Sequence, residues 1–177
     1  MPIRETHHGH QIIAVDGMMG ETPNLNALQE AYPVHKGMKY PQFHAMAAYD
    51  VLNDMFLAAD FLPGPANERQ MAMELLSWAT LQGDKKIFLF DRGFPSVALI
   101  QKLNTMGHKF VMRVSDSFLK EVNEFAKSRF IDKTISISCH PRRGAVNRVM
   151  AELPYEFTLR CVRIHLIDGS EEIGITN

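Results

Sequence analysis

The clearest sign of the fold is the run Ile87-Phe88-Leu89-Phe90, followed at once by Asp91-Arg92-Gly93-Phe94-Pro95. The short apolar run is typical of a buried strand, and Asp91 stands at its carboxyl end. Pro95 suits the first turn of a helix, and Gly107 suits its end, so residues 95–107 predict an amphipathic helix. An acid at the exit of a buried strand, before a glycine turn, is where α/β folds place their chemistry.

A second acid has the same setting. Asp16 follows Ile12-Ile13-Ala14-Val15 and precedes Gly17, which predicts a short buried strand over residues 11–16. For a lone Asp-Gly pair, backbone hydrogen bonds in a turn would be the simpler interpretation. Together, Asp16 and Asp91 favour a site for a divalent cation that supports phosphoryl transfer, because Mg²⁺ prefers hard oxygen ligands.

Composition bounds the class of protein. The chain has 177 residues, 46% hydrophobic and 22% charged, which suits one domain with a sizeable core. The net charge of −1 gives no global basic field, so any nucleic-acid contact must come from a local patch. Cys139 and Cys161 have no CxxC spacing, which favours a reduced cytosolic protein over a disulfide scaffold. No apolar run approaches the roughly 18 residues that a membrane helix needs.

The order of elements predicts an α/β fold. Residues 43–52 and 55–62 are apolar runs joined by Asn53-Asp54, and we favour a β-hairpin there over a helix. A helix with Asn67 as its N-cap should run to Gly83 and bury Trp78. Residues 17–42 are predicted to be mostly loop. A further helix is predicted at 117–127. Further strands are predicted at 86–90, 109–114, 134–138, 157–167 and 172–176. This order predicts a mixed sheet flanked by helices, as in the ribonuclease-H-like fold, with a β-rich segment toward the C-terminus.

Five stretches carry a resemblance to a known family. In chain order they are IAVDG (13–17), YDVL (49–52), NER (67–69), DRGFPS (91–96) and FVMRV (110–114). Together they resemble the DDE transposases of bacterial insertion sequences, in the "IS-four" group. The stretch at 91–96 is the most specific of them, and Met18 departs from the family, which usually has Thr or Ser there.

The resemblance implies a ribonuclease-H-like core in which three acids hold two Mg²⁺ or Mn²⁺ ions. Asp16 would be the first acid and Asp91 the second. The third acid in the family is a Glu on a helix after the last core strand, within a Tyr-Arg-Glu-Lys pattern that this sequence does not contain. The implied activity is metal-dependent cleavage and strand transfer at mobile-element ends, in the bacterial cytoplasm at the nucleoid.

The same resemblance implies the domain organisation. Residues 1–177 would form a single transposase core, with 131–170 as a β-rich insertion. The N-terminal DNA-binding segment and the C-terminal Glu-bearing helix of the family are not found in this sequence. We therefore expect the chain to be inactive alone. The implied partners are DNA and another transposase chain, and no membrane is implied.

Further charged residues have a plain and a functional interpretation. The plain interpretation of Glu68 and Arg69 is a pair of surface charges at the start of a helix. The resemblance implies that they support the active site. The plain interpretation of Arg142, Arg143 and Arg148 is a solvated hairpin tip. The functional interpretation is that they contact phosphates, because the Arg guanidinium matches phosphate geometry.

Two other functions fit parts of the sequence. A haloacid-dehalogenase site needs a second Asp two residues along the strand from Asp16, where Ala14 and Met18 stand, so it is discounted. A non-catalytic transposase remnant that binds DNA or another protein is the remaining alternative, and the absent third acid supports it.

Overall fold

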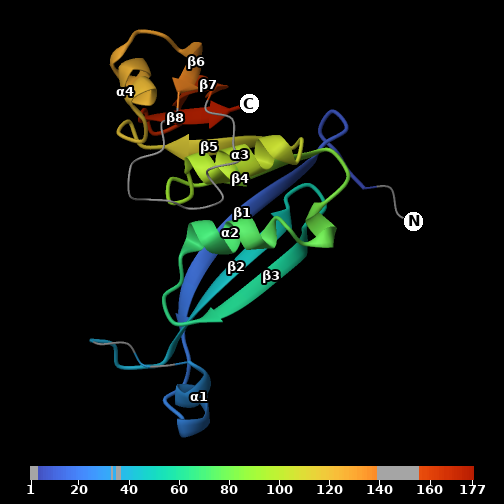
Figure 1. Ribbon diagram of the computed structural model, residues 1–177, viewed down its shortest axis with the longest axis vertical. Coiled ribbons are helices and arrows are strands. Elements are labelled where there is room, and N and C mark those ends of the chain that lie inside the picture. Colours follow the sequence, from blue (N-terminus) through green and yellow to red (C-terminus); the bar gives the residue numbers. More distant parts are fainter. Residues whose placement is uncertain (1–3, 33, 35–36, 139–155) are drawn as a thin grey trace. The chain divides into compact units, whose positions relative to one another are not determined.

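The computed structural model describes residues 4–32, 34, 37–138 and 156–177. The chain divides into two compact units, residues 1–86 and 87–177 (Figure 1). None of the described helices is long and apolar enough to span a membrane.

The first unit is built on three antiparallel strands. These are β1 (Gln11–Glu21), β2 (Gln42–Asp50) and β3 (Met55–Pro63), with β2 in the middle. The helix α2 (Glu68–Leu75) lies along β2 and β3, and α1 (Asn26–Ala31) lies beyond the carboxyl end of β1 (Figure 1). Alternate residues of the strands are buried with the inner face of α2; they include Ile13, Val15, Met46, Ala48, Met71 and Leu75.

The predicted β-hairpin is confirmed, and its turn has a clear cause. Asp50 is fully buried at the end of β2, and its Oδ1 accepts hydrogen bonds from the backbone N–H groups of Leu52 and Asn53, each at 3.2 Å. Gln11 donates its side-chain amide to Asp50 Oδ2 at 3.2 Å, which ties β1 to the same turn. Asp54 then takes a φ of +52°, a conformation that Asp tolerates better than most residues.

The strand β1 is longer than predicted, so Asp16 lies within a strand and not at its end. Pairing with β2 continues from Gly17 opposite Met46 to Glu21 opposite Gln42. A Cβ on Gly20 would come within 2.3 Å of the Phe43 ring. Glycine here leaves room for the Phe43 ring from the neighbouring strand, whereas the sequence indicates mostly loop over these residues.

The helix predicted from Asn67 to Gly83 is also corrected. Asn67 is the N-cap, and its side chain accepts from the N–H groups of Arg69 and Gln70, as expected. However, α2 ends at Leu75, and a short 3₁₀ helix, η1 (Ala79–Leu81), follows. Trp78 has extended backbone angles between the two and is 40% exposed. The prediction of a core Trp78 is therefore wrong, because the helical stripe stops before it.

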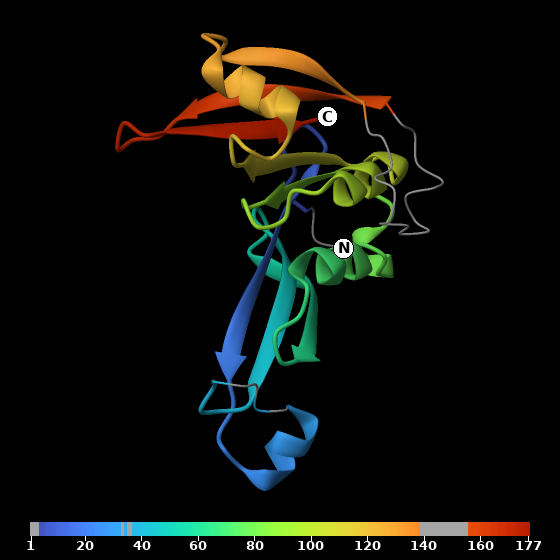
Figure 2. The same cartoon turned by 60° about the vertical axis from the view of Figure 1, so that its left-hand side comes forward.

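The second unit combines a parallel strand pair with an antiparallel group. The strands are β4 (Lys86–Phe90), β5 (Lys109–Val114), β6 (Asp132–Ser138), β7 (Glu156–His165) and β8 (Glu171–Thr176), in the order β4-β5-β8-β7-β6. Only β4 and β5 run parallel within this group. The helix α3 (Val97–Thr105) contacts β5, and α4 (Lys120–Lys127) lies across β6 (Figure 2).

Helix starts in the second unit differ slightly from the prediction. Ser96 is the N-cap of α3 and its Oγ accepts from the N–H of Leu99 at 3.2 Å, so Pro95 lies just before the helix and not in its first turn. The helix predicted over 117–127 begins at Lys120. The five strands predicted for this unit are present, with ends that differ by a few residues from those expected.

Candidate functional site

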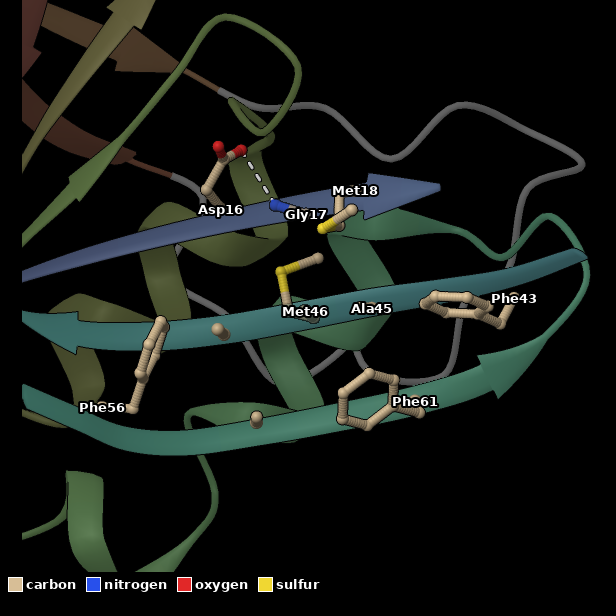
Figure 3. A pocket seen from close by; sticks show the side chains of 10 residues that line it. Asp16, Gly17, Met18, Phe43, Ala45, Met46, Phe56 and Phe61 are labelled. Carbon is tan, nitrogen blue, oxygen red and sulfur yellow. Dashed lines mark hydrogen bonds between the residues drawn. The ribbon is translucent and has the colours of Figure 1, made fainter. Parts of the chain in front are cut away.

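Asp16 stands at the margin of an apolar pocket on the first unit. The pocket has a volume of about 630 Å³ and is lined by Met18, Phe43, Ala45, Phe56 and Phe61 beside Asp16 (Figure 3). Asp16 pairs with Ala47, and Ala47 with Ala59, so small side chains form the floor between the rings. The Asp16 side chain is exposed, and its Oδ1 accepts the N–H of Gly17 at 2.8 Å. This carboxylate is therefore open to solvent and fixed on one side by its own backbone.

The opposite face of β1 meets a buried histidine. Successive residues of a strand face opposite sides, so Gly17 faces away from the side to which Asp16 points. A Cβ on Gly17 would lie 3.3 Å from Nε2 of His44, which leaves glycine as the residue with room there. The Nδ1 of His44 accepts the N–H of Ala66 at 3.3 Å, which leaves Nε2 as the protonated nitrogen, donating to Glu68 Oε1 at 3.1 Å. Glu68 thus fastens the start of α2 to β2, on the face opposite the Asp16 carboxylate.

Asp91 directly follows β4, as predicted, and it is part of a charged network in the second unit. Its side chain is 59% exposed, and its Oδ1 lies 3.2 Å from the NH1 nitrogen of Arg113. The remaining nitrogens of the Arg113 fork donate to both oxygens of Glu172. Arg92 adds a second contact to Glu172, with 2.9 Å between its NH2 nitrogen and Oε1. Two arginines therefore balance two carboxylates.

Strand register explains why these side chains meet. Phe90 on β4 is opposite Met112 on β5, so Asp91 comes next to Arg113. Arg113 is opposite Gly174 on β8, and Glu172 lies two residues before Gly174, on the same face. Diagonal neighbours of this kind are within reach of long side chains such as those of Arg113 and Glu172. The pairing of β4, β5 and β8 thus brings the side chains of the network together.

Hydrogen bonding dominates the electrostatics of this network. The bonds from Arg113 lower the pKa of the Glu172 carboxyl below its ordinary value, and burial opposes this effect. The bonds to Glu172 raise the pKa of Arg113 in turn. Both groups therefore stay charged at neutral pH. Only 9% of the Glu172 side chain is exposed, so it is the fixed anchor of the network.

The predicted site residues are placed as follows. The pairing of Asp16 with Asp91 spans the two units and stays a prediction. Arg69 is the second residue of α2, and its N–H donates to Asn67 Oδ1 at 3.1 Å. Arg142, Arg143 and Arg148 lie outside the described residues.

Sequence reasoning gave no role to Arg113 or Glu172. A signal was present, because the predicted strands 109–114 and 172–176 carry the opposite charges of Arg113 and Glu172. Without the register of β5 and β8, however, nothing in the sequence showed that they pair.

The donor chemistry of the two acids fits Mg²⁺ or Mn²⁺. Both Asp16 and Asp91 are exposed carboxylates, which offer the hard oxygen atoms that these ions take. Within the part of the chain that the structure describes, no group of three or more His, Cys, Asp or Glu side chains is arranged to hold a metal. The described residues therefore supply donors of the right kind without a complete cage.

Comparison with solved structures identifies the fold. The chain is similar to the piggyBac transposase in its synaptic complex with hairpin DNA, determined by cryo-electron microscopy, with a TM-score of 0.53 and 12% sequence identity. The match covers 94% of this chain and 33% of that one, so this chain spans about a third of that transposase. The likeness confirms the predicted α/β, ribonuclease-H-like fold class. No curated protein sequence matches the chain.

A family comparison gives the assignment. The family model described as "Transposase DDE domain" matches residues 7–160, which include β1 with Asp16 and β4 with Asp91, whereas Glu172 lies beyond the matched segment. The match extends over most of the chain, and the chain therefore belongs to the family of DDE-domain transposases.

Proposed function

We propose that this chain is the catalytic core of a bacterial insertion-sequence transposase that cleaves and joins DNA at mobile-element ends. The observation that carries the proposal is the exposed Asp91 directly after β4, inside the stretch DRGFPS and within the matched family segment. The family membership supports transposition, while the IS-four group rests on the resemblance of the five sequence stretches.

The residues that would hold divalent ions are Asp16 and Asp91. When bound, Mg²⁺ or Mn²⁺ would activate a water or a 3′-hydroxyl and stabilise the leaving oxygen. The chain's own contribution is positioning. The Gly17 N–H holds one oxygen of Asp16, and Arg113 holds one oxygen of Asp91, so each carboxylate keeps a second oxygen without a hydrogen-bond partner among the described residues.

DNA is the proposed partner, together with a second transposase chain. Arg142, Arg143 and Arg148 remain the candidates for phosphate contacts, on the basis of sequence. We also propose that Arg69 and Glu68 support the site from the start of α2, where Glu68 holds His44. Action at the bacterial nucleoid stays a prediction.

We further propose that the chain alone does not cleave DNA. The family completes its site with a third acid on a helix, and two carboxylates leave the ions weakly held. Glu68 is a poor substitute, because its carboxylate is bound to His44 on the face opposite Asp16. A non-catalytic remnant that binds DNA or another chain is the second candidate function.

Nicking of supercoiled plasmid in Mg²⁺ or Mn²⁺ tests the activity. We expect none from this chain above the level of an Asp91→Ala variant. Robust nicking that Asp91→Ala abolishes would show that another residue supplies the third ligand.

The reading frame beyond the Asn177 codon separates the two functions. A continuing frame with a Tyr-Arg-Glu-Lys helix would support the transposase. The protein expressed with that continuation should then cleave mobile-element ends and lose cleavage in Asp16→Asn and in Asp91→Asn. A stop codon would favour the non-catalytic remnant.

A further inference from the structure

The network around Asp91 has a feature that a simple ion pair lacks. One guanidinium, from Arg113, spans two carboxylates, and the two are held unequally. Glu172 receives two bonds from the fork, whereas Asp91 receives one contact of 3.2 Å on Oδ1. Arg has its donors in a rigid plane, so the bonds to Glu172 fix the direction in which the last nitrogen reaches Asp91.

Exposure shows which partner is the anchor. Glu172 is 9% exposed and also contacts Arg92, while Asp91 is 59% exposed. Arg113 is itself 46% exposed, so it can move, but its strongest attachment is to the buried carboxylate. The contact with Asp91 is therefore the part of the network that a competing cation would displace.

We propose that Arg113 is a positioning residue that partly neutralises Asp91 before a divalent ion binds, and that Glu172 limits its hold on Asp91. Glu172 draws the fork away, so that Asp91 keeps one oxygen for the ion. This inference rests on the proposed function, because it takes Asp91 as a metal ligand.

Two opposite effects on Mn²⁺ affinity follow. Arg113→Gln removes a positive charge about one ion-pair distance from the ligand, and we expect a tighter dissociation constant by about three- to tenfold. Glu172→Gln releases the fork, which can then take both oxygens of Asp91 as a bidentate pair. We expect Mn²⁺ binding to weaken by a similar factor.

The weakening has a second possible origin, because Glu172→Gln also removes a nearby negative charge. A double-mutant cycle separates the two. If Glu172 acts through Arg113, Glu172→Gln has less than a twofold effect in the Arg113→Gln background. If Glu172 acts as a ligand or through its field alone, the effect stays the same in both backgrounds, and the proposal is wrong.

The measurement is the concentration of free Mn²⁺ by electron paramagnetic resonance during titration of the whole chain, at fixed ionic strength. Circular dichroism and a thermal melt establish that each variant is folded. If Arg113→Gln does not fold, Arg113→Lys replaces it in the cycle. Its single ammonium cannot span both carboxylates and should stay with the more buried Glu172, so Mn²⁺ binding again tightens.

A matched control is Arg160→Gln. Arg160 on β7 pairs with Asp132 on β6, so this variant loses the same charge from a strand-to-strand ion pair that does not include Asp91. Its Mn²⁺ affinity should stay within twofold of the original chain. Tightening equal to that of Arg113→Gln would show a general charge effect and overturn the proposal.

Asp91→Asn distinguishes failure of the proposed metal site from failure of the proposed role of Arg113. If it leaves Mn²⁺ binding unchanged, the proposed metal site is wrong. If it weakens binding at least tenfold while Arg113→Gln has no effect, the metal site stands and the role of Arg113 is wrong.

Discussion

At Cys161, in the middle of β7, burial sets the chemistry of a single side chain. The thiol is fully buried, and desolvation of the thiolate raises its pKa from 9.0 to about 11. Between these values the unfolded chain loses the proton and the folded chain keeps it, so the folded state binds more protons. The unfolding free energy must then fall as pH rises from 9 to 11, by up to about 1.4 kcal/mol per pH unit from this group.

Comparison with Cys161→Ala isolates this term, because other groups titrate equally in both proteins. The measurement is urea unfolding of both proteins at pH 8, 9.5 and 10.5. The unfolding free energy of the original chain should fall relative to that of Cys161→Ala as pH rises. A difference that is constant over this range would mean that the folded thiol titrates normally.

Individual residues were predictable where the local sequence decides their place. The place of Asp91 was predictable, because an apolar run before it and a glycine shortly after it mark the end of a strand. Trp78 was not, because the end of α2 at Leu75 carries no glycine or proline. Glu172 was missed since its partner, Arg113, is set by the pairing of distant strands.

At the scale of elements, the β2–β3 turn depends on one buried carboxylate. Asp50→Ala would leave two backbone N–H groups and the Gln11 amide without their acceptor. An unsatisfied group costs about 1–3 kcal/mol when it is buried, and the two N–H groups are only part-buried, so we expect a total loss of roughly 3 kcal/mol in unfolding free energy. The measurement is urea unfolding followed by circular dichroism.

The control for this prediction lies in the same turn. Asp54 has a φ of +52°, which glycine adopts readily, and the hydrogen bond that its side chain accepts from the Tyr49 hydroxyl is exposed, so Asp54→Gly should change stability by less than about 1 kcal/mol. If both variants lose the same stability, the hydrogen bonds of Asp50 are not what holds the turn.

Elements with a clear period were predicted well, and their ends less so. The hairpin and β4 to β8 have apolar runs or alternation that favour strands. The second half of β1 lacks both, and Gly17 and Gly20 stand where side chains of β2 need the space that a Cβ would take. Its strand conformation comes from pairing with β2, which is not visible locally.

For the whole molecule, the order of elements was enough to predict the fold class, since few α/β arrangements fit that order. The relation of Asp16 to Asp91 depends on packing between segments far apart in sequence. The same holds for any DNA surface, because the net charge of −1 provides no general attraction to DNA.

DNA binding is therefore expected to depend on a few local arginines. Arg142, Arg143 and Arg148 occur within seven residues of one another in sequence. Each phosphate neutralised contributes about −0.9 to the slope of log affinity against log salt concentration, so three contacts give a slope of about −3. Replacing all three by Ala should weaken binding of a duplex oligonucleotide at low salt and bring the slope close to zero, as measured by fluorescence anisotropy.

The same change in charge at other positions separates local contacts from net charge. Lys85, Lys109 and Lys127 are exposed, and replacing them by Ala also removes three positive charges. If the arginines contact phosphate, the lysine variant keeps a slope near about −3 and binds nearly as well as the original chain. The expected binding is weak and independent of sequence, because phosphate contacts position a protein on DNA without reading its bases. If both triple variants lose the same affinity, binding follows overall charge, and residues 131–170 have another role, such as packing or contact with a protein partner.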